Sequence, residues 1–234
     1  MFEKKEKVAL RIFDEGGVKF GEFKLKLHEK YPDAPKSPIY ISLRRPPDGS
    51  LSEETIEEIG ILLAEFWARK AINIDYVAGI PKAGEVIAES FMRGLTKINL
   101  FPVPDLLHFK KEESASGRRI SSLIETNYER GANIKLLIVD DLITEAGTKL
   151  EARDEAEKGW LNVTDFLVLL DREQGGAKEI SRRGYRFHSV FTLGGLLDFY
   201  VSRKKITPKM RQEVLSYRQR HEEYMARQRT KIRG

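Results

Sequence analysis

The chain has 234 residues and a formal net charge of +5, which suits one globular domain with short extensions. It contains no cysteine, and this excludes disulfide bonds, cysteine-based metal sites and cysteine nucleophiles. No apolar run approaches the roughly 18 residues of a membrane span, and the first residues hold too short an apolar run for a signal peptide. We therefore expect a cytoplasmic protein.

Strands and helices are predicted to alternate along most of the chain. Residues 1–47 combine short elements with turns and include a predicted strand over 37–44. The apolar stripe of 52–70 predicts a helix that is capped by Ser52. Further strands are predicted over 75–80, 106–109, 136–139, 165–171 and 186–193, and helices over 85–94 and 148–159. This alternation predicts an α/β domain with a mainly parallel sheet, whose ligands bind at the carboxyl ends of the strands.

Positive charge is concentrated at the end of the chain. Residues 203–234 hold eleven lysines and arginines against three glutamates. A helix is predicted after Thr207 and Pro208, and one of its faces carries Met210, Val214, Tyr217, His221, Tyr224 and Met225. This face is expected to dock on the body of the protein or on a second subunit. Nucleic-acid binding by the basic residues is the alternative.

The stretch LLIVDDLITEAGTKLEA, residues 136–152, places two carboxylates and a Gly/Thr loop between a strand and a helix. Free backbone N–H groups and the helix dipole make the loop 144–148 a natural anion site. Asp140 and Asp141 would repel a phosphate and need hydroxyl groups or a positive charge. A ribose 5-phosphate meets both needs, and a cationic C1′ would be stabilised by the same carboxylates. The alternative is that one aspartate only caps a helix.

A second strand-to-helix turn has similar chemistry. The stretch AGIPKAG, residues 78–84, follows a predicted strand and precedes a predicted helix. Its small residues expose backbone N–H groups, and Lys82 adds a cation. Because it lies one βαβ unit before the first loop, both loops are expected at the same edge of the sheet.

The pattern DD-x-x-T-x-x-G-T resembles the phosphoribosyl pyrophosphate motif of the type I phosphoribosyltransferases. Within that family, four further stretches resemble orotate phosphoribosyltransferase: GEFKLK…SPIYISLR, FKKEESASG, VTDFLVLLDREQGG and YRFHSVFTL. The resemblance covers about residues 20–202. It implies a mainly parallel sheet flanked by helices, divided into an N-terminal hood (1–47), a phosphoribosyltransferase core (48–202) and a basic C-terminal helical tail (203–234).

The resemblance implies transfer of a phosphoribosyl group from phosphoribosyl pyrophosphate to orotate, giving orotidine 5′-monophosphate in pyrimidine biosynthesis. Mg²⁺ would be held mainly by substrate and water rather than by protein ligands, and a homodimer with shared sites is expected. Donor binding is implied for Lys110, Lys111, Asp140, Asp141, Leu142, Ile143, Thr144, Glu145, Ala146, Gly147 and Thr148. The pyrophosphate loop would comprise Gly79, Ile80, Pro81, Lys82, Ala83 and Gly84. Orotate would be bound by Lys26, Tyr40, Ile41, Thr144 and Arg172, and the catalytic set would be Asp140, Asp141, Lys111 and Lys26.

The sequence also departs from the family pattern. Ser114 and Ser116 stand where the family has a lysine and a histidine in its catalytic loop, and residues 27–36 are an insertion after Lys26. Glu145 adds a charge to the phosphate loop. Two other readings therefore remain: a phosphoribosyltransferase for a different base, and a regulator that binds the donor and uses its basic tail on nucleic acid. Single residues also have simpler alternatives: Arg172 could form a surface ion pair, Lys26 could be a solvated lysine, and Tyr40 could be a core aromatic.

Overall fold

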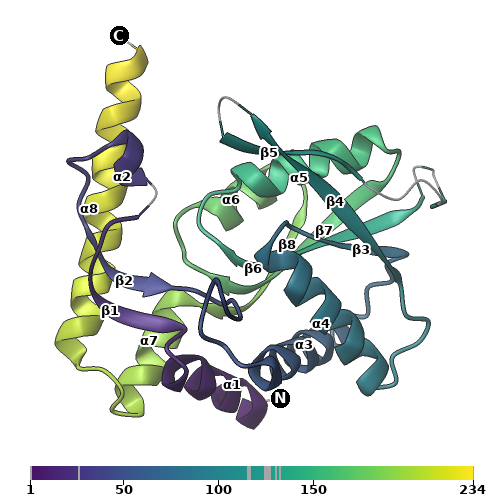
Figure 1. Cartoon of the computed structure of the whole chain (residues 1–234), viewed down its shortest axis with the longest axis horizontal. Coiled ribbons are helices and arrows are strands. Elements are labelled where there is room, and N and C mark those ends of the chain that lie inside the picture. Colours follow the sequence, from purple (N-terminus) through teal and green to yellow (C-terminus); the bar gives the residue numbers. More distant parts are fainter. Residues whose placement is uncertain are drawn as a thin grey trace.

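The computed structural model describes residues 2–25, 27–114, 117–123, 128–129, 131 and 133–233 (Figure 1). Its strands are β1 (Val18–Phe23), β2 (Ser37–Ile41), β3 (Tyr76–Gly79), β4 (Asp105–Ser114), β5 (Gly117–Leu123), β6 (Lys135–Ile143), β7 (Asn162–Asp171) and β8 (Arg186–Thr192). Its helices are α1 (Phe2–Asp14), α2 (Leu27–Lys30), α3 (Glu53–Ala68), α4 (Ala83–Lys97), α5 (Gly147–Lys158), α6 (Gly176–Arg182), α7 (Leu193–Ser202) and α8 (Pro208–Arg233).

The central sheet has the strand order β5-β4-β3-β6-β7-β8. Strands β3, β4, β6, β7 and β8 pair in parallel, and β5 joins β4 antiparallel. The middle strands are apolar on both faces, because each face of a parallel sheet is covered by helices. The predicted α/β class and the mainly parallel sheet are confirmed.

Helices cover the sheet on both faces. Helices α3 and α4 lie on one face, and α5 and α6 lie on the other (Figure 1). The contact between α3 and α4 is very close, since a Cβ on Gly60 would lie 2.1 Å from the carbonyl oxygen of Ser90. Among the described residues, no helix is both long and apolar enough to cross a membrane.

The predicted hood and C-terminal helix are both present. Strands β1 and β2 form an antiparallel pair, and α8 runs beside them (Figure 1). On α8, Val214 and Tyr217 are buried, so the apolar face of this helix docks on the body of the same chain. One apolar cluster joins Val8, Leu197 and Val214, which come from the three predicted ranges. The division of the chain into those ranges stays a prediction.

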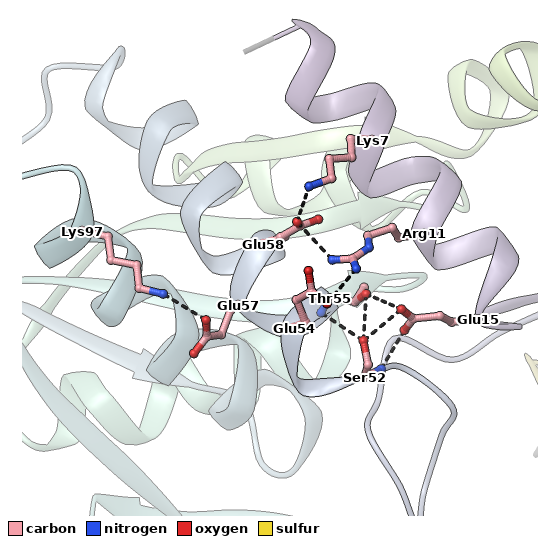
Figure 2. Close-up of polar contacts among 9 residues, drawn as sticks. All are labelled: Lys7, Arg11, Glu15, Ser52, Glu54, Thr55, Glu57, Glu58 and Lys97. Carbon is pink, nitrogen blue, oxygen red and sulfur yellow. Dashed lines mark hydrogen bonds and ion pairs between the residues drawn. The ribbon is translucent and has the colours of Figure 1, made fainter.

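The N-terminal helix α1 was not predicted, because residues 1–47 were expected to form only short elements. Its buried residues Val8, Ala9 and Ile12 have the spacing of one helical face. Figure 2 shows how α1 is joined to α3. The carboxylate of Glu15 accepts hydrogen bonds from the backbone N–H and hydroxyl of Ser52, at 2.7 and 2.9 Å, and from the Thr55 hydroxyl at 2.6 Å. Ion pairs extend this contact: Lys7–Glu58, Arg11–Glu54 and Arg11–Glu58, with Lys97–Glu57 joining α4 to α3.

Candidate active site

The two predicted loops meet at the carboxyl ends of the neighbouring strands β3 and β6. The backbone N–H of Ile80 donates to the carbonyl oxygen of Val139 at 2.9 Å. A Cβ on Gly84 would lie 2.7 Å from Asp140 Oδ1 and 2.8 Å from the carbonyl oxygen of Val139. Only glycine therefore lets the start of α4 approach Asp140 so closely. The structure brings the 78–84 turn and the carboxylate pair into one site.

Both loops end in open helix N-termini. Helix α4 begins after Lys82 and α5 begins after Ala146, and neither residue makes a side-chain capping hydrogen bond. N–H groups at a helix start can bind an anion, although in α4 the N–H of Glu85 already donates to the carbonyl oxygen of Ile80 at 3.1 Å. Nothing lies within 4 Å of the position that a Cβ on Gly147 would occupy. Glu145 is exposed, so its carboxylate is directed to the surface of the loop and not into its core.

The carboxylate pair is buried at the end of β6 and includes a lysine. Asp140 and Asp141 are 7% and 8% exposed, and Lys149 of α5 is 5% exposed. The Lys149 ammonium pairs with Asp140 Oδ2 and donates to the carbonyl oxygen of Leu142 at 2.9 Å. Asp140 Oδ1 accepts from the N–H of Asp141 at 2.8 Å. Asp140 is therefore already compensated by a cation from the protein itself.

Asp141 lies in a different electrostatic environment. Burial, followed by repulsion from the neighbouring Asp140, raises the pKa of Asp141 to about 8. Its Oδ1 accepts a hydrogen bond from the N–H of Leu142 at 2.8 Å, which opposes the rise only in part. At neutral pH this carboxyl group is largely protonated and can donate a hydrogen bond. A hydrogen bond between the two carboxyl groups is a further cause of the raised pKa, so the proton of Asp141 is shared with Asp140.

Lys149 was missed in the sequence prediction, although the sequence carried a signal. A lysine in the first turn of a helix is unfavourable, because the helix N-terminus is the positive end of the dipole. Such a residue needs a nearby anion, and two aspartates stand at the end of the preceding strand. The ion pair with Asp140 supplies that anion.

Arg172 follows the last residue of β7 and lies next to the phosphate loop. Its backbone N–H donates to the carbonyl oxygen of Ile143 at 3.0 Å, and the N–H of Gly176 donates to the carbonyl oxygen of Thr144 at 3.0 Å. The arginine is only 8% exposed, and burial lowers the pKa of its guanidinium. Within the described part of the chain, no acceptor reaches its Nε atom. Arg172 therefore does not serve as the partner of a surface ion pair.

The two predicted pocket residues on β2 point to opposite faces of the strand. Ile41 is 7% exposed and belongs to the main apolar cluster, whereas Tyr40 is 40% exposed and packs its ring on Phe23 at 5.7 Å between centroids. This agrees with the alternating direction of neighbouring strand residues. The Ile41 side chain points into the core, and both Ile41 and Tyr40 stay predicted pocket residues.

The predicted catalytic loop is extended structure over most of its described length. Strand β4 continues to Ser114 and pairs with β5, so that Lys110 lies opposite Ser122. The prediction of a loop was wrong here, because the antiparallel partner β5 satisfies the backbone of this segment. The exposed Lys110 side chain pairs with Glu112 at 3.0 Å. Lys26 and Ser116 lie outside the described residues, and Lys111 is described only in its backbone.

The donor set around the carboxylates does not fit a magnesium ion held by the protein. Asp140 already pairs with Lys149, and Asp141 favours its protonated form. Mg²⁺ prefers oxygen ligands and keeps several of its waters. A cation carried by a substrate's own phosphate oxygens is compatible with the site, whereas one held by these two carboxylates is not.

No protein-family model matches the chain, but comparison with known proteins finds relatives of similar sequence. The chain is 30% identical to uridine 5′-monophosphate synthase of Bos taurus over 204 residues, which cover 87% of this chain and 38% of that protein. It is 27% identical to orotate phosphoribosyltransferase of Caenorhabditis elegans over 197 residues, which cover 84% of this chain and 78% of that protein. The chain thus spans well under half of the bovine synthase and most of the nematode transferase.

Solved structures agree with these relatives. The structure of UMP synthase from Leishmania donovani matches with a TM-score of 0.67 at 25% identity, covering 91% of this chain and 42% of that one. Orotate phosphoribosyltransferase from Aeropyrum pernix matches with a TM-score of 0.64 at 23% identity, covering 82% of this chain and 96% of that one. The predicted fold, a parallel sheet flanked by helices with a hood, is confirmed by this likeness.

Proposed function

Because the chain belongs to the orotate phosphoribosyltransferase family, we propose that it transfers the 5-phosphoribosyl group of phosphoribosyl pyrophosphate to orotate, with release of pyrophosphate. The observation that carries the proposal is the packing of Gly84 on Asp140. This contact places two open helix N-termini and two buried carboxyl groups together at the ends of adjacent strands.

Each part of the donor has a matching group. The loop 144–148 at the start of α5 would hold the 5-phosphate, and the 79–84 turn at the start of α4 would hold the pyrophosphate. Asp140 and Asp141, which share a proton, would form hydrogen bonds with the ribose hydroxyls. Mg²⁺ would enter with the pyrophosphate and neutralise part of its charge. In this proposal Lys110 and Lys111 assist the pyrophosphate as it leaves, and Lys26 binds orotate.

The chemistry follows from the charge that develops at C1′. As the bond to pyrophosphate lengthens, C1′ becomes cationic, and nearby carboxylates stabilise that state more than the ground state. Ionisation of Asp141 is favoured at that moment, because a positive charge close by lowers the pKa of a carboxyl group. Orotate then attacks C1′ through a ring nitrogen. The carboxylate pair is thus proposed to act electrostatically and not as a nucleophile.

The test is pyrophosphate release from phosphoribosyl pyrophosphate, Mg²⁺ and a panel of bases that includes orotate. We expect release with orotate. In the double variant Asp140→Asn, Asp141→Asn we expect a fall in turnover of about 100-fold or more, while the fold is retained. Release by wild-type protein only with another base would overturn the choice of substrate, and near-normal turnover in the double variant would overturn the role of the carboxylates.

A phosphoribosyltransferase for a different base is the second candidate. It is favoured by the insertion 27–36, which departs from the family pattern, and by α8, whose His221 lies near both Arg172 and His28. The homodimer, the dependence on Mg²⁺ and the cytoplasmic location stay predictions. The regulator reading stays a third candidate, because the docking of the apolar face of α8 does not test its basic residues.

A further inference from the structure

The insertion 27–36 and the C-terminal helix α8, which both depart from the family pattern, pack on each other. Figure 1 shows α2, which belongs to the insertion 27–36, beside α8. The rings of Tyr31 and Tyr224 meet edge to face, with 6.3 Å between their centroids. His28 lies near enough to His221 to lower the pKa of that residue in part, after the larger effect of burial. The insertion and the C-terminal helix therefore form one structural unit.

This unit reaches the loops at the carboxyl ends of β6 and β7. Arg218 of α8 pairs at 3.3 Å with Glu173, the residue that follows Arg172 in the chain. Arg172 acts electrostatically on both Tyr217 and His221, and Glu145 of the phosphate loop acts on His221. Helix α8 is thus part of the neighbourhood of the candidate active site.

Three buried polar atoms in this neighbourhood lack a hydrogen-bond partner among the described residues: Arg172 Nε, Tyr217 Oη and His221 Nδ1. Arg172 is 8% exposed and Tyr217 is 2% exposed. Ser37 lies close enough to the tyrosine hydroxyl to lower the pKa of Tyr217, but the contact does not reach the geometry of a formed hydrogen bond. Buried polar groups are rarely left unsatisfied, because each such group costs free energy. Three of them together indicate a ligand that brings its own polar atoms.

We propose that Tyr217 and His221 of α8 complete the base-binding pocket around Arg172 and determine which base it accepts. This inference rests on the proposed function and names additional residues for the same site. A base with a carboxylate, ring carbonyls and ring N–H groups offers acceptors to the guanidinium and to the tyrosine hydroxyl, and donors or acceptors to the imidazole. The C-terminal helix then has a role in substrate binding in addition to its role in packing.

A purely structural role for α8 makes a different prediction. If Tyr217 served only to fill the core, its replacement by phenylalanine would keep the ring and remove a hydroxyl that has no well-formed bond. Such a change would leave substrate binding as it was. The hydroxyl is therefore the atom that separates the two roles.

The first variant is Tyr217→Phe, with Tyr224→Phe on the same face of α8 as the matched control. We expect the KM for orotate to rise about tenfold in Tyr217→Phe, which corresponds to the loss of one hydrogen bond. The KM for phosphoribosyl pyrophosphate and the melting temperature should stay close to the wild-type values. Tyr224→Phe should leave all three quantities unchanged. An unaltered KM for orotate in Tyr217→Phe would overturn the inference.

The second pair of variants tests His221. An asparagine side chain can place a polar atom near the position of Nδ1, whereas leucine cannot. We expect His221→Leu to raise the KM for orotate about tenfold and His221→Asn to recover most of that loss. Equal KM values in wild type and His221→Leu would contradict the role of the imidazole.

These outcomes are distinguishable from a failure of the proposed function. If wild-type protein turns over orotate and the variants match it, the function stands and the inference fails. If wild-type protein turns over only another base, the proposed substrate fails. The same variants then support the inference when the KM for that other base rises, and overturn it when that KM is unchanged. If no base is turned over, equilibrium binding of orotate to wild type and to Tyr217→Phe decides, and equal or undetectable affinities overturn the inference.

Discussion

The substitution Asp141→Asn should make the protein more stable at alkaline pH while it lowers activity. Moving the pKa of one carboxyl group from 3.8 to about 8 corresponds to about 6 kcal/mol between the two protonation states, at about 1.4 kcal/mol per pH unit. Because Asp140 and Lys149 share the charge of the site, we expect a smaller effect, about 2–3 kcal/mol at pH 8.5.

The sign of this pH dependence follows from the raised pKa. The contribution of Asp141 to the free energy of unfolding is complete below its ordinary pKa near 4 and is lost as the pH rises through about 8. Asparagine does not ionise, so the variant escapes this loss. The stability difference between variant and wild type should therefore be small at pH 5 and should grow toward pH 8.5, in favour of the variant.

Urea unfolding between pH 5 and pH 8.5 measures this difference, and tryptophan fluorescence can follow it because Trp67 is buried. Asp154→Asn is the matched control, since the Asp154 side chain is on α5 and 55% exposed. The control should show the wild-type dependence on pH. Turnover of Asp141→Asn should fall about 100-fold. A variant that is less stable than wild type at pH 8.5, with an unchanged dependence on pH, would refute the assignment of Asp141 as a buried, largely protonated carboxyl group.

Three further predictions concern stability. Lys149→Met leaves Asp140 buried without its cation and should lower the free energy of unfolding by about 3 kcal/mol, and adding Asp140→Asn should restore most of it in the same urea experiment. Gly60→Ala should cost about 1–3 kcal/mol because its Cβ would lie 2.1 Å from the carbonyl oxygen of Ser90, whereas Gly147→Ala, with open space around it, should not destabilise. Burial raises the pKa of Asp165, but hydrogen bonds from His188, Arg186 and Thr164 outweigh this effect and lower it. Arg186→Gln removes one of these partners, whose guanidinium is half-exposed, and should lower the free energy of unfolding by about 1–2 kcal/mol above pH 4 and by less as the pH falls. Loss of stability in Arg186→Gln that is equal at pH 3 and pH 7 would contradict that last assignment.

The parallel sheet could be predicted because its strands contain short apolar runs that are followed by polar residues, as at Asp171, although β6 continues past Asp140 to Ile143. The carboxylate pair and the two loops could be placed at one edge because parallel strands end on the same side. Helix α1 could have been predicted from the helical spacing of Val8, Ala9 and Ile12, but residues 1–47 were expected to form only short elements.

The remaining features depend on tertiary contacts that no local pattern encodes. The pairing of β4 with β5 turned a predicted loop into strand as far as Ser114. The direction of Ile41 into the core follows from the register of β1 and β2, which is fixed by the apolar cluster below them. The approach of Tyr217 to Arg172 joins residues 45 positions apart through the docking of α8, so neither side chain could be assigned a partner from the sequence.

The two halves of the candidate site differ in charge, and this difference constrains the ligand. On the ribose side, Lys149 compensates Asp140, and Asp141 holds a proton at neutral pH, so this half is polar and close to neutral. On the other side, Arg172 is buried, and among the described residues its Nε atom has no hydrogen-bond partner. An unpaired buried cation is costly, and an anionic base would remove that cost, whereas a neutral base would remove only part of it. We therefore expect the proposed site to prefer an anionic base. The same reasoning predicts that Arg172→Met should weaken binding of orotate far more than binding of a neutral pyrimidine such as uracil.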